Sequence, residues 1–190
     1  VSQDLLGRDQ LHWNYFLDSD ASVMYGSDWL AAPGSEFRSV AIVNRYSALD
    51  MYAAGFAASS EVAPLGLIRG GVGNATDPPR LGATTPGSLE TISIEQVIAA
   101  SGERNPSSAR SQKDFRAAFI VLTRPGEVLP PATVMSLEQF RIRAQQYFAQ
   151  ITQSRASIRI STEAQSSANV GLPQILIGSG ATPSPPGIAS

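Results

Sequence analysis

The chain has 190 residues and a formal net charge of −2, with one histidine and no cysteine. This composition excludes disulfides, cysteine nucleophiles and thiolate-bound iron–sulfur clusters, and His12 alone is too few ligands for a zinc site. The thirteen arginines are scattered along the sequence without a basic cluster, so we expect no binding to nucleic acid.

The hydrophobic pattern predicts an α+β fold, a small mixed domain with short strands and about three helices. Strands are expected over residues 40–43, 116–123 and 157–161, where β-branched or alternating apolar residues gather. The continuous apolar run inside residues 116–123 is typical of a central strand that is covered on both faces. It is also the longest strongly apolar run, far short of the roughly 20 residues that a membrane-spanning helix needs.

Helices are expected over residues 47–56, 94–101 and 136–151, where apolar residues recur at spacings of three and four. Each has a serine at or just before its start, with an acidic or amide residue three positions later, which is the capping-box pattern. The serines predicted as N-caps are Ser47, Ser93 and Ser136.

Long loops rich in glycine and proline connect these elements, above all over residues 69–88. We expect one globular unit over residues 1–161, followed by an extended tail rich in Ser, Gly and Pro over residues 162–190. That tail has little apolar surface to bury, so we expect it to be disordered alone in solution and ordered only if a partner holds it or it folds back on its own domain. The partner-binding prolines would be Pro183, Pro185 and Pro186.

Charged residues make up only 16% of the chain, against roughly 25% in typical soluble domains. Such a surface either faces another protein subunit or is simply rich in Ser, Thr, Gln and Ala. Trp13 and Trp29 in the aromatic N-terminal segment are the other candidates for binding a partner. His12, beside Trp13, either packs among these aromatic residues or supplies one imidazole to zinc.

Asp18 and Asp20 place carboxylates at alternate positions, and Asp28 adds a third nearby. Calcium loops use this spacing because a hard cation takes several oxygens from one tight turn. The match to an EF-hand fails, because Val23 stands where glycine is needed and Trp29 stands where the bidentate glutamate belongs. The alternative is a turn that the aspartates shape by bonding to their own backbone.

Two sequence blocks resemble a known family. The first runs from His12-Trp13 through Tyr15-Phe16-Leu17-Asp18-Ser19-Asp20-Ala21-Ser22-Val23-Met24 to Gly26-Ser27-Asp28-Trp29, and the second is Tyr46-Ser47-Ala48-Leu49-Asp50-Met51-Tyr52-Ala53-Ala54-Gly55-Phe56. Both are similar to segments of secreted bacterial proteins related to zinc metallopeptidases, and the resemblance extends more weakly over residues 10–160.

In that family these blocks follow an H-E-x-x-H helix that supplies two zinc imidazoles and a water-activating glutamate. The resemblance implies that His12 is the third zinc ligand. The present sequence contains no H-E-x-x-H, so it is either the C-terminal part of a longer protein or a relative that kept the scaffold and lost catalysis.

We therefore predict a non-catalytic bacterial subunit without a cofactor of its own, periplasmic or secreted, that interacts with other protein subunits. The alternative is the C-terminal portion of a secreted zinc metallopeptidase with His12 as third ligand. A further possibility is a calcium-stabilised secreted module built on Asp18, Asp20 and Asp28.

Overall fold

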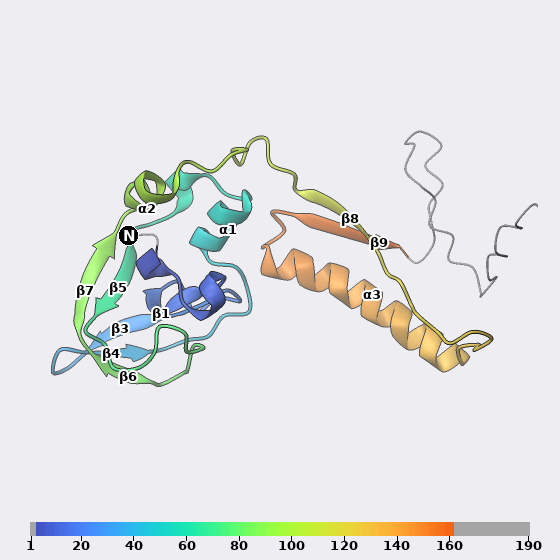
Figure 1. Ribbon diagram of the computed structural model, residues 1–190, viewed down its shortest axis with the longest axis horizontal. Coiled ribbons are helices and arrows are strands. Elements are labelled where there is room, and N and C mark those ends of the chain that lie inside the picture. The colour runs from blue at the N-terminus through green and yellow to red at the C-terminus, as the bar shows by residue number, and fades with distance from the viewer. Residues whose placement is uncertain (1–2, 162–190) are drawn as a thin grey trace, which may run out of the picture. The chain divides into compact units, whose positions relative to one another are not determined.

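The computed structural model describes residues 3–161 of the chain (Figure 1). The predicted tail over residues 162–190, with Pro183, Pro185 and Pro186, lies outside these described residues. Where the sequence predicts one unit over residues 1–161, the contacts separate two compact units. Of the described residues, 3–113 and 148–156 form the first unit, and 114–147 and 157–161 form the second.

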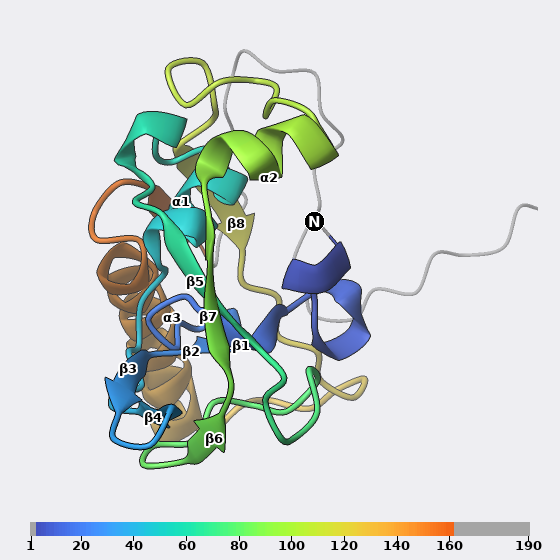
Figure 2. The same cartoon turned by 90° about the vertical axis from the view of Figure 1, so that its left-hand side faces the viewer.

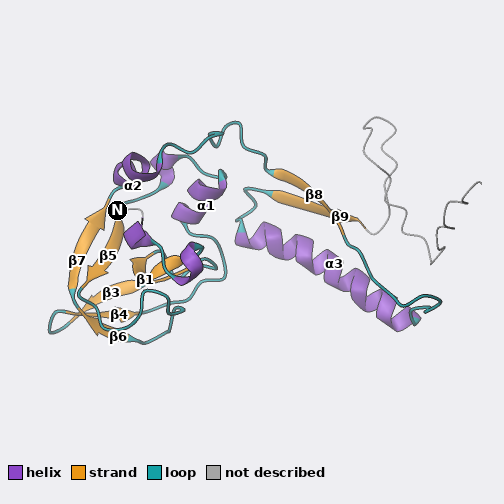
Figure 3. Ribbon diagram, in the orientation of Figure 1, coloured by secondary structure: helices purple, strands orange, loops and turns teal. Residues whose placement is uncertain are grey.

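The described residues form an α+β fold, as predicted, with mixed sheets and three α-helices (Figure 3). The helices are α1 (Ala48–Ala54), α2 (Ile94–Ser101) and α3 (Pro131–Ile151), with 3-10 turns at Gln3–Leu5, Arg8–Gln10 and Ser59–Glu61. The strands are β1 (Trp13–Asp18), β2 (Tyr25–Ser27), β3 (Trp29–Ala32), β4 (Glu36–Ser39), β5 (Leu65–Arg69), β6 (Thr84–Pro86), β7 (Ser88–Ile92), β8 (Asp114–Ala118) and β9 (Ser157–Ser161). No helix between residues 3 and 161 combines the length and the apolar character needed to cross a bilayer.

The first unit contains two sheets. One has the strand order β2-β1-β5-β7, in which β1 is parallel to β2 and antiparallel to β5, and β7 runs antiparallel beside β5 (Figure 2). The other is antiparallel with the order β3-β4-β6. The hydrophobic core lies in this unit, and Leu17 and Leu67 face each other across β1 and β5 near its centre with almost no exposed surface.

Both short helices begin where the sequence predicts. The Ser47 hydroxyl accepts from the Asp50 backbone N–H, and the Asp50 carboxylate accepts from the Ser47 N–H at 2.7 Å. Ser93 and Gln96 form the same reciprocal pair at the start of α2. These capping boxes satisfy backbone donors that a helix N-terminus otherwise leaves unpaired, so the predictions of both helix starts are confirmed.

The glycine-rich segment over residues 69–88 belongs to the first unit and packs against β1. A Cβ on Gly71 would lie 2.4 Å from the Phe16 ring, so only glycine fits there without displacement. The Val72 N–H donates to the Thr85 hydroxyl at 2.8 Å, and the Tyr15 N–H donates to the Ala75 carbonyl at 2.9 Å. The segment also contributes β6, which the sequence prediction of a long loop did not include.

The strand predicted over residues 40–43 is wrong. The β4 ladder ends at Ser39, and the next residues bond to loops rather than to a strand. The Val40 N–H donates to the Asp28 carbonyl, and the Val43 N–H donates to the Ala21 carbonyl. A β-branched run is suited to a strand but becomes one only where another strand pairs with it.

The strand predicted over residues 116–123 is correct only at its start. The observed β8 ends at Ala118 and belongs to a two-stranded sheet, so it is not a central strand covered on both faces. The apolar residues that follow Ala118 are not part of a strand, and Ile120 and Leu122 among them are exposed. The strand predicted over residues 157–161 is confirmed as β9.

The helix predicted over residues 136–151 begins five residues earlier, at Pro131. Proline suits the first turn of a helix, where its missing N–H would have no partner. Ser136 is therefore inside α3 instead of capping it, and its hydroxyl donates to the Ala132 carbonyl at 3.0 Å.

The second unit is a β-α-β arrangement. Its strands β8 and β9 are parallel and are joined through α3. Phe115 and Ile158 are register partners, and their side chains are half-buried, while the next residue on each strand is exposed. No side chain among residues 114–147 and 157–161 is buried, so the described part of this unit lacks a core of its own.

Candidate functional site

His12 lies just before β1, at the end of the 3-10 turn that Arg8–Gln10 forms. Its ring is held on two sides, because Nδ1 lies 3.4 Å from the Arg8 carbonyl oxygen and the ring centroid lies 4.4 Å from that of Tyr25. A metal-bound histidine commonly has its second ring nitrogen fixed by such a carbonyl. The geometry therefore suits either a packed aromatic residue or a ligand, which are the two alternatives from the sequence.

Trp13 joins the two blocks that resemble the metallopeptidase-related proteins. Its indole Nε1–H donates to one carboxylate oxygen of Asp50, while the other oxygen accepts from Ser47. Asp50 is only 4% exposed, so both carboxylate oxygens are used inside the protein. Asp50 and Trp13 thus hold the start of α1 against the start of β1, and Trp13 is not a free surface residue.

Trp29, the other predicted partner-binding tryptophan, is in the core with 4% of its surface exposed. Its Nε1–H donates to the Tyr15 carbonyl at 3.1 Å, and its ring meets that of Tyr15 edge-on at 5.4 Å. A side chain packed in this way stabilises the first unit and offers no surface to a partner.

The three aspartates predicted to bind calcium affect one another electrostatically. Burial raises the pKa of Asp18 to about 6, and the charges of Asp28 and Asp20 add to the rise. Burial and the charge of Asp20 also raise the pKa of Asp28. The carboxylate of Asp18 accepts from the Trp29 N–H at 3.4 Å, so it lies against backbone instead of open solvent.

Within residues 3–161 there is no group of three or more His, Cys, Asp or Glu side chains arranged to hold a metal ion. His12 therefore has no two further protein ligands in the described chain. Asp18, Asp20 and Asp28 likewise do not come together as one set of ligands. A zinc site with three side-chain ligands would therefore need ligands from outside these residues.

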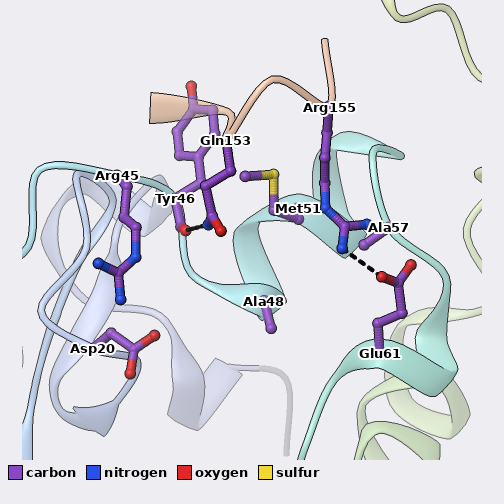
Figure 4. Close-up of a pocket in the computed structure, with 9 residues that line it drawn as sticks. All are labelled: Asp20, Arg45, Tyr46, Ala48, Met51, Ala57, Glu61, Gln153 and Arg155. Atoms are coloured by element: carbon purple, nitrogen blue, oxygen red, sulfur yellow. Dashed lines mark hydrogen bonds and ion pairs between the residues drawn. The ribbon is translucent and has the colours of Figure 1, made fainter. Parts of the chain in front are cut away.

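A pocket of about 240 Å³ lies in the first unit, between the end of β1, the segment before α1 and the residues after α3 (Figure 4). The Arg155 guanidinium pairs with Glu61 at 2.6 Å, and the Gln153 amide donates to the Tyr46 carbonyl at 3.1 Å. The side chains of Arg45 and Asp20 point toward one another (Figure 4). Opposite charges thus face each other inside the pocket, which leaves little net charge to attract an ionic ligand. Its lining residues are Asp20, Arg45, Tyr46, Ala48, Met51, Ala57, Glu61, Gln153 and Arg155.

The main feature that sequence reasoning missed is the apolar surface of the second unit. The described residues include fifteen exposed large apolar side chains, and eight of these lie in the second unit. This unit holds only about a quarter of the described residues. Leu122 and Val128 are 90% and 88% exposed. The eight are Ile120, Leu122, Val128, Val134, Met135, Phe140, Ile142 and Tyr147.

The helix α3 is apolar over more of its circumference than the two strands cover. Its half-buried residues follow a stripe that includes Leu137, Ala144 and Phe148. At about 100° per residue, Met135 and Ile142 lie beside that stripe on one side, and both are exposed. On the other side of Met135 and Ile142 lies a strip of exposed polar residues, Gln139, Arg143, Gln146 and Gln150. The periodicity of apolar residues predicts this helix from the sequence. It does not show which of its apolar side chains other elements bury.

Comparison with protein-family models, with curated proteins and with solved structures finds no match to this chain. The resemblance of residues 10–160 to metallopeptidase-related proteins therefore stays an expectation from the sequence.

We predict that Trp13→Phe lowers the free energy of unfolding by about 1–3 kcal/mol, because it leaves a buried carboxylate oxygen of Asp50 without its donor. The measurement is urea unfolding of the wild type, Trp13→Phe, Asp50→Ala and the double variant. We expect the double variant to be less destabilised than the sum of the single variants by at least about 1 kcal/mol. Additive effects would show that the two side chains are not coupled.

We predict that Asp18→Asn stabilises the first unit at pH 8 and that this gain disappears as the pH falls. The folded state holds the Asp18 proton with a pKa of about 6, above the ordinary value of 3.8, so ionised Asp18 destabilises the fold above pH 6. As the pH falls through 6 and then below 3.8, the carboxyl group becomes protonated first in the folded and then in the unfolded state, and the difference vanishes. Because Asp18 is only half-buried, we expect about 1 kcal/mol at pH 8.

Thermal unfolding between pH 3.5 and 8 measures this difference, with Glu103→Gln on the exposed surface as the control for loss of one negative charge. A stability gain for Asp18→Asn that is the same at every pH would contradict the prediction.

Proposed function

We propose that the chain is a non-catalytic interaction subunit of a larger protein assembly, and that it acts outside the cytoplasm. The single observation that supports this function is the second unit, whose described residues contain no buried side chain but eight exposed large apolar ones. A two-stranded sheet with one helix that buries none of its described side chains has little apolar burial to stabilise it. A high density of exposed apolar side chains in one small unit favours a region that binds another protein.

The site chemistry supports a role without catalysis. Asp50 is used as a helix cap and as an acceptor for Trp13, and the charges of the pocket in Figure 4 face one another. Placement outside the cytoplasm rests on the resemblance to secreted bacterial proteins, and a chain without cysteine is compatible with any redox compartment.

We predict that Met135→Glu with Ile142→Glu releases the chain from its assembly. Both side chains are exposed on α3, so the charges would be placed in the interface and not in the chain's own packing. The matched control is Gln139→Glu with Gln146→Glu, which puts the same two charges on the polar strip of the same helix.

The measurement is size-exclusion chromatography of the tagged protein from its own cells. The wild type and the control should elute in a complex, and the Met135/Ile142 variant should elute at the mass of a single chain. A wild type that elutes as a single chain, or an apolar-face variant that stays in the complex, would exclude this function.

A second candidate function is the C-terminal portion of a secreted zinc metallopeptidase with His12 as third ligand. The observation that favours it is the support of the His12 ring by the Arg8 carbonyl and by Tyr25, a setting that suits a metal ligand. The residues between 3 and 161 do not supply a full zinc site. Two further ligands would have to come from protein outside that range.

For this candidate we predict that the full-length gene product contains about one zinc ion per chain and that His12→Ala loses most of it. Metal analysis by mass spectrometry after dialysis makes the comparison, and a folded variant is verified by circular dichroism. Zinc at full stoichiometry in His12→Ala would rule out His12 as a ligand.

A further inference from the structure

The sheet of β8 and β9 has two edges, and side chains of α3 bond to the backbone of one of them, at Ile160 on β9. On β9, the Ile160 N–H donates to the Gln145 side-chain oxygen at 2.7 Å, and the Ile160 carbonyl accepts from the Arg141 guanidinium. These backbone groups point away from β8 and are already bonded. At Ile160 the β9 edge is thus blocked against pairing with another strand, a protection that exposed edges in proteins commonly have.

No strand within residues 3–161 pairs with the opposite edge, on β8. Along a parallel strand, successive residues bond alternately to the two sides. The Phe119 N–H donates to the Ser161 carbonyl at 2.9 Å, which fixes the phase of this alternation. By the same phase Arg116 and Ala118 direct their backbone groups away from β9. Among the described residues, no hydrogen bond outside the β8/β9 pair involves the backbone of Arg116 or Ala118.

The positive charges beside this edge favour a partner segment with negative charges. Arg116 and Arg159 are register partners on neighbouring strands, and both are exposed. Like charges at paired positions repel, so a negative charge beside them would be stabilising. The described part of the second unit has five arginines and three carboxylates, a net charge of +2, although the whole chain has a net charge of −2.

A second copy of the chain is a poor occupant of this edge. Arg116 is the middle residue of β8, so an antiparallel pair of β8 strands from two copies that pairs all five residues would set Arg116 opposite its own equivalent. Such a contact would add a third and a fourth arginine to the existing pair across the joined sheet.

We propose that the open edge of β8 binds an extended, acidic segment of a partner protein, which adds as a third strand and places an Asp or Glu beside Arg116. This mode of recognition combines backbone hydrogen bonds, which give affinity, with side-chain contacts, which give specificity. The inference rests on the proposed function as an interaction subunit and specifies the chemistry of one partner segment.

The test uses the whole chain and two fluorescent capped nonapeptides, one with alternating valine and glutamate and one in which lysine replaces each glutamate. By fluorescence anisotropy we expect the glutamate peptide to bind at least about tenfold more tightly. Arg116→Glu should reverse this preference, and Arg124→Glu, in the loop after β8, should keep it.

Ala118→Pro separates edge pairing from simple charge attraction. It removes an N–H at the open edge without removing a β8/β9 hydrogen bond, so thermal unfolding should change little while binding of the glutamate peptide is lost. The inference is overturned if the wild type binds both peptides equally or neither at millimolar concentration. It is also overturned if Ala118→Pro binds like the wild type, or if the wild type forms a dimer that Ala118→Pro abolishes.

Failure of this inference is distinguishable from failure of the proposed function. Peptides that do not bind at β8, together with a native complex that dissociates when Met135 and Ile142 are replaced, would leave the interaction role in place. A wild type without any complex would remove both.

Discussion

The organisation of the first unit depends on one buried carboxylate. Asp50 must have both oxygens satisfied, because an unpaired charge inside a protein is strongly destabilising. One oxygen fixes the N-terminus of α1 through Ser47, and the other binds the Trp13 indole at the start of β1. The opposite end of α1 is held by Arg104, whose guanidinium donates to the carbonyls of Ala53 and Ala54 at 3.0 Å. A helix of seven residues is thus held at both ends by side chains that are about 40 to 50 residues away along the chain.

Features that depend on neighbouring residues could be predicted from the sequence, and those that depend on distant ones could not. The capping boxes of Ser47 and Ser93 lie within four residues each, so their pattern identified both helix starts. The Trp13–Asp50 bond joins residues 37 positions apart, and nothing in either block indicates it. The apolar residues around 40–43 and 119–123 have strand composition, but a strand also needs a partner at its edge, and composition does not reveal one. For the same reason the candidate residues Trp13 and Trp29 were identified as aromatic but could not be placed inside the first unit.

The two units differ in how they use apolar residues. The first buries Leu17, Leu67 and Trp29 in a core between sheets and helices, and a domain that does this can be stable alone. The second places Leu122, Val128 and Met135 where water reaches them. Among the described residues, backbone groups on the outer edge of β8 also have no strand beside them, whereas those of Ile160 on β9 bond to α3. The exposed apolar side chains and this unpaired strand edge are the observations on which the proposed interaction role depends.

The continuity of α3 has a consequence for how the second unit becomes ordered. The helix runs from Pro131 to Ile151, so its last turn belongs to the first unit while most of its length belongs to the second. In that last turn the Ile151 carbonyl accepts from the Tyr46 N–H at 2.8 Å, and Ile151 is buried. Forming the first turn is the unfavourable step in making any helix, and each later residue adds with little further penalty. Because the first unit fixes this last turn of α3, the unfavourable free energy of helix nucleation is offset by contacts of a unit that has its own core.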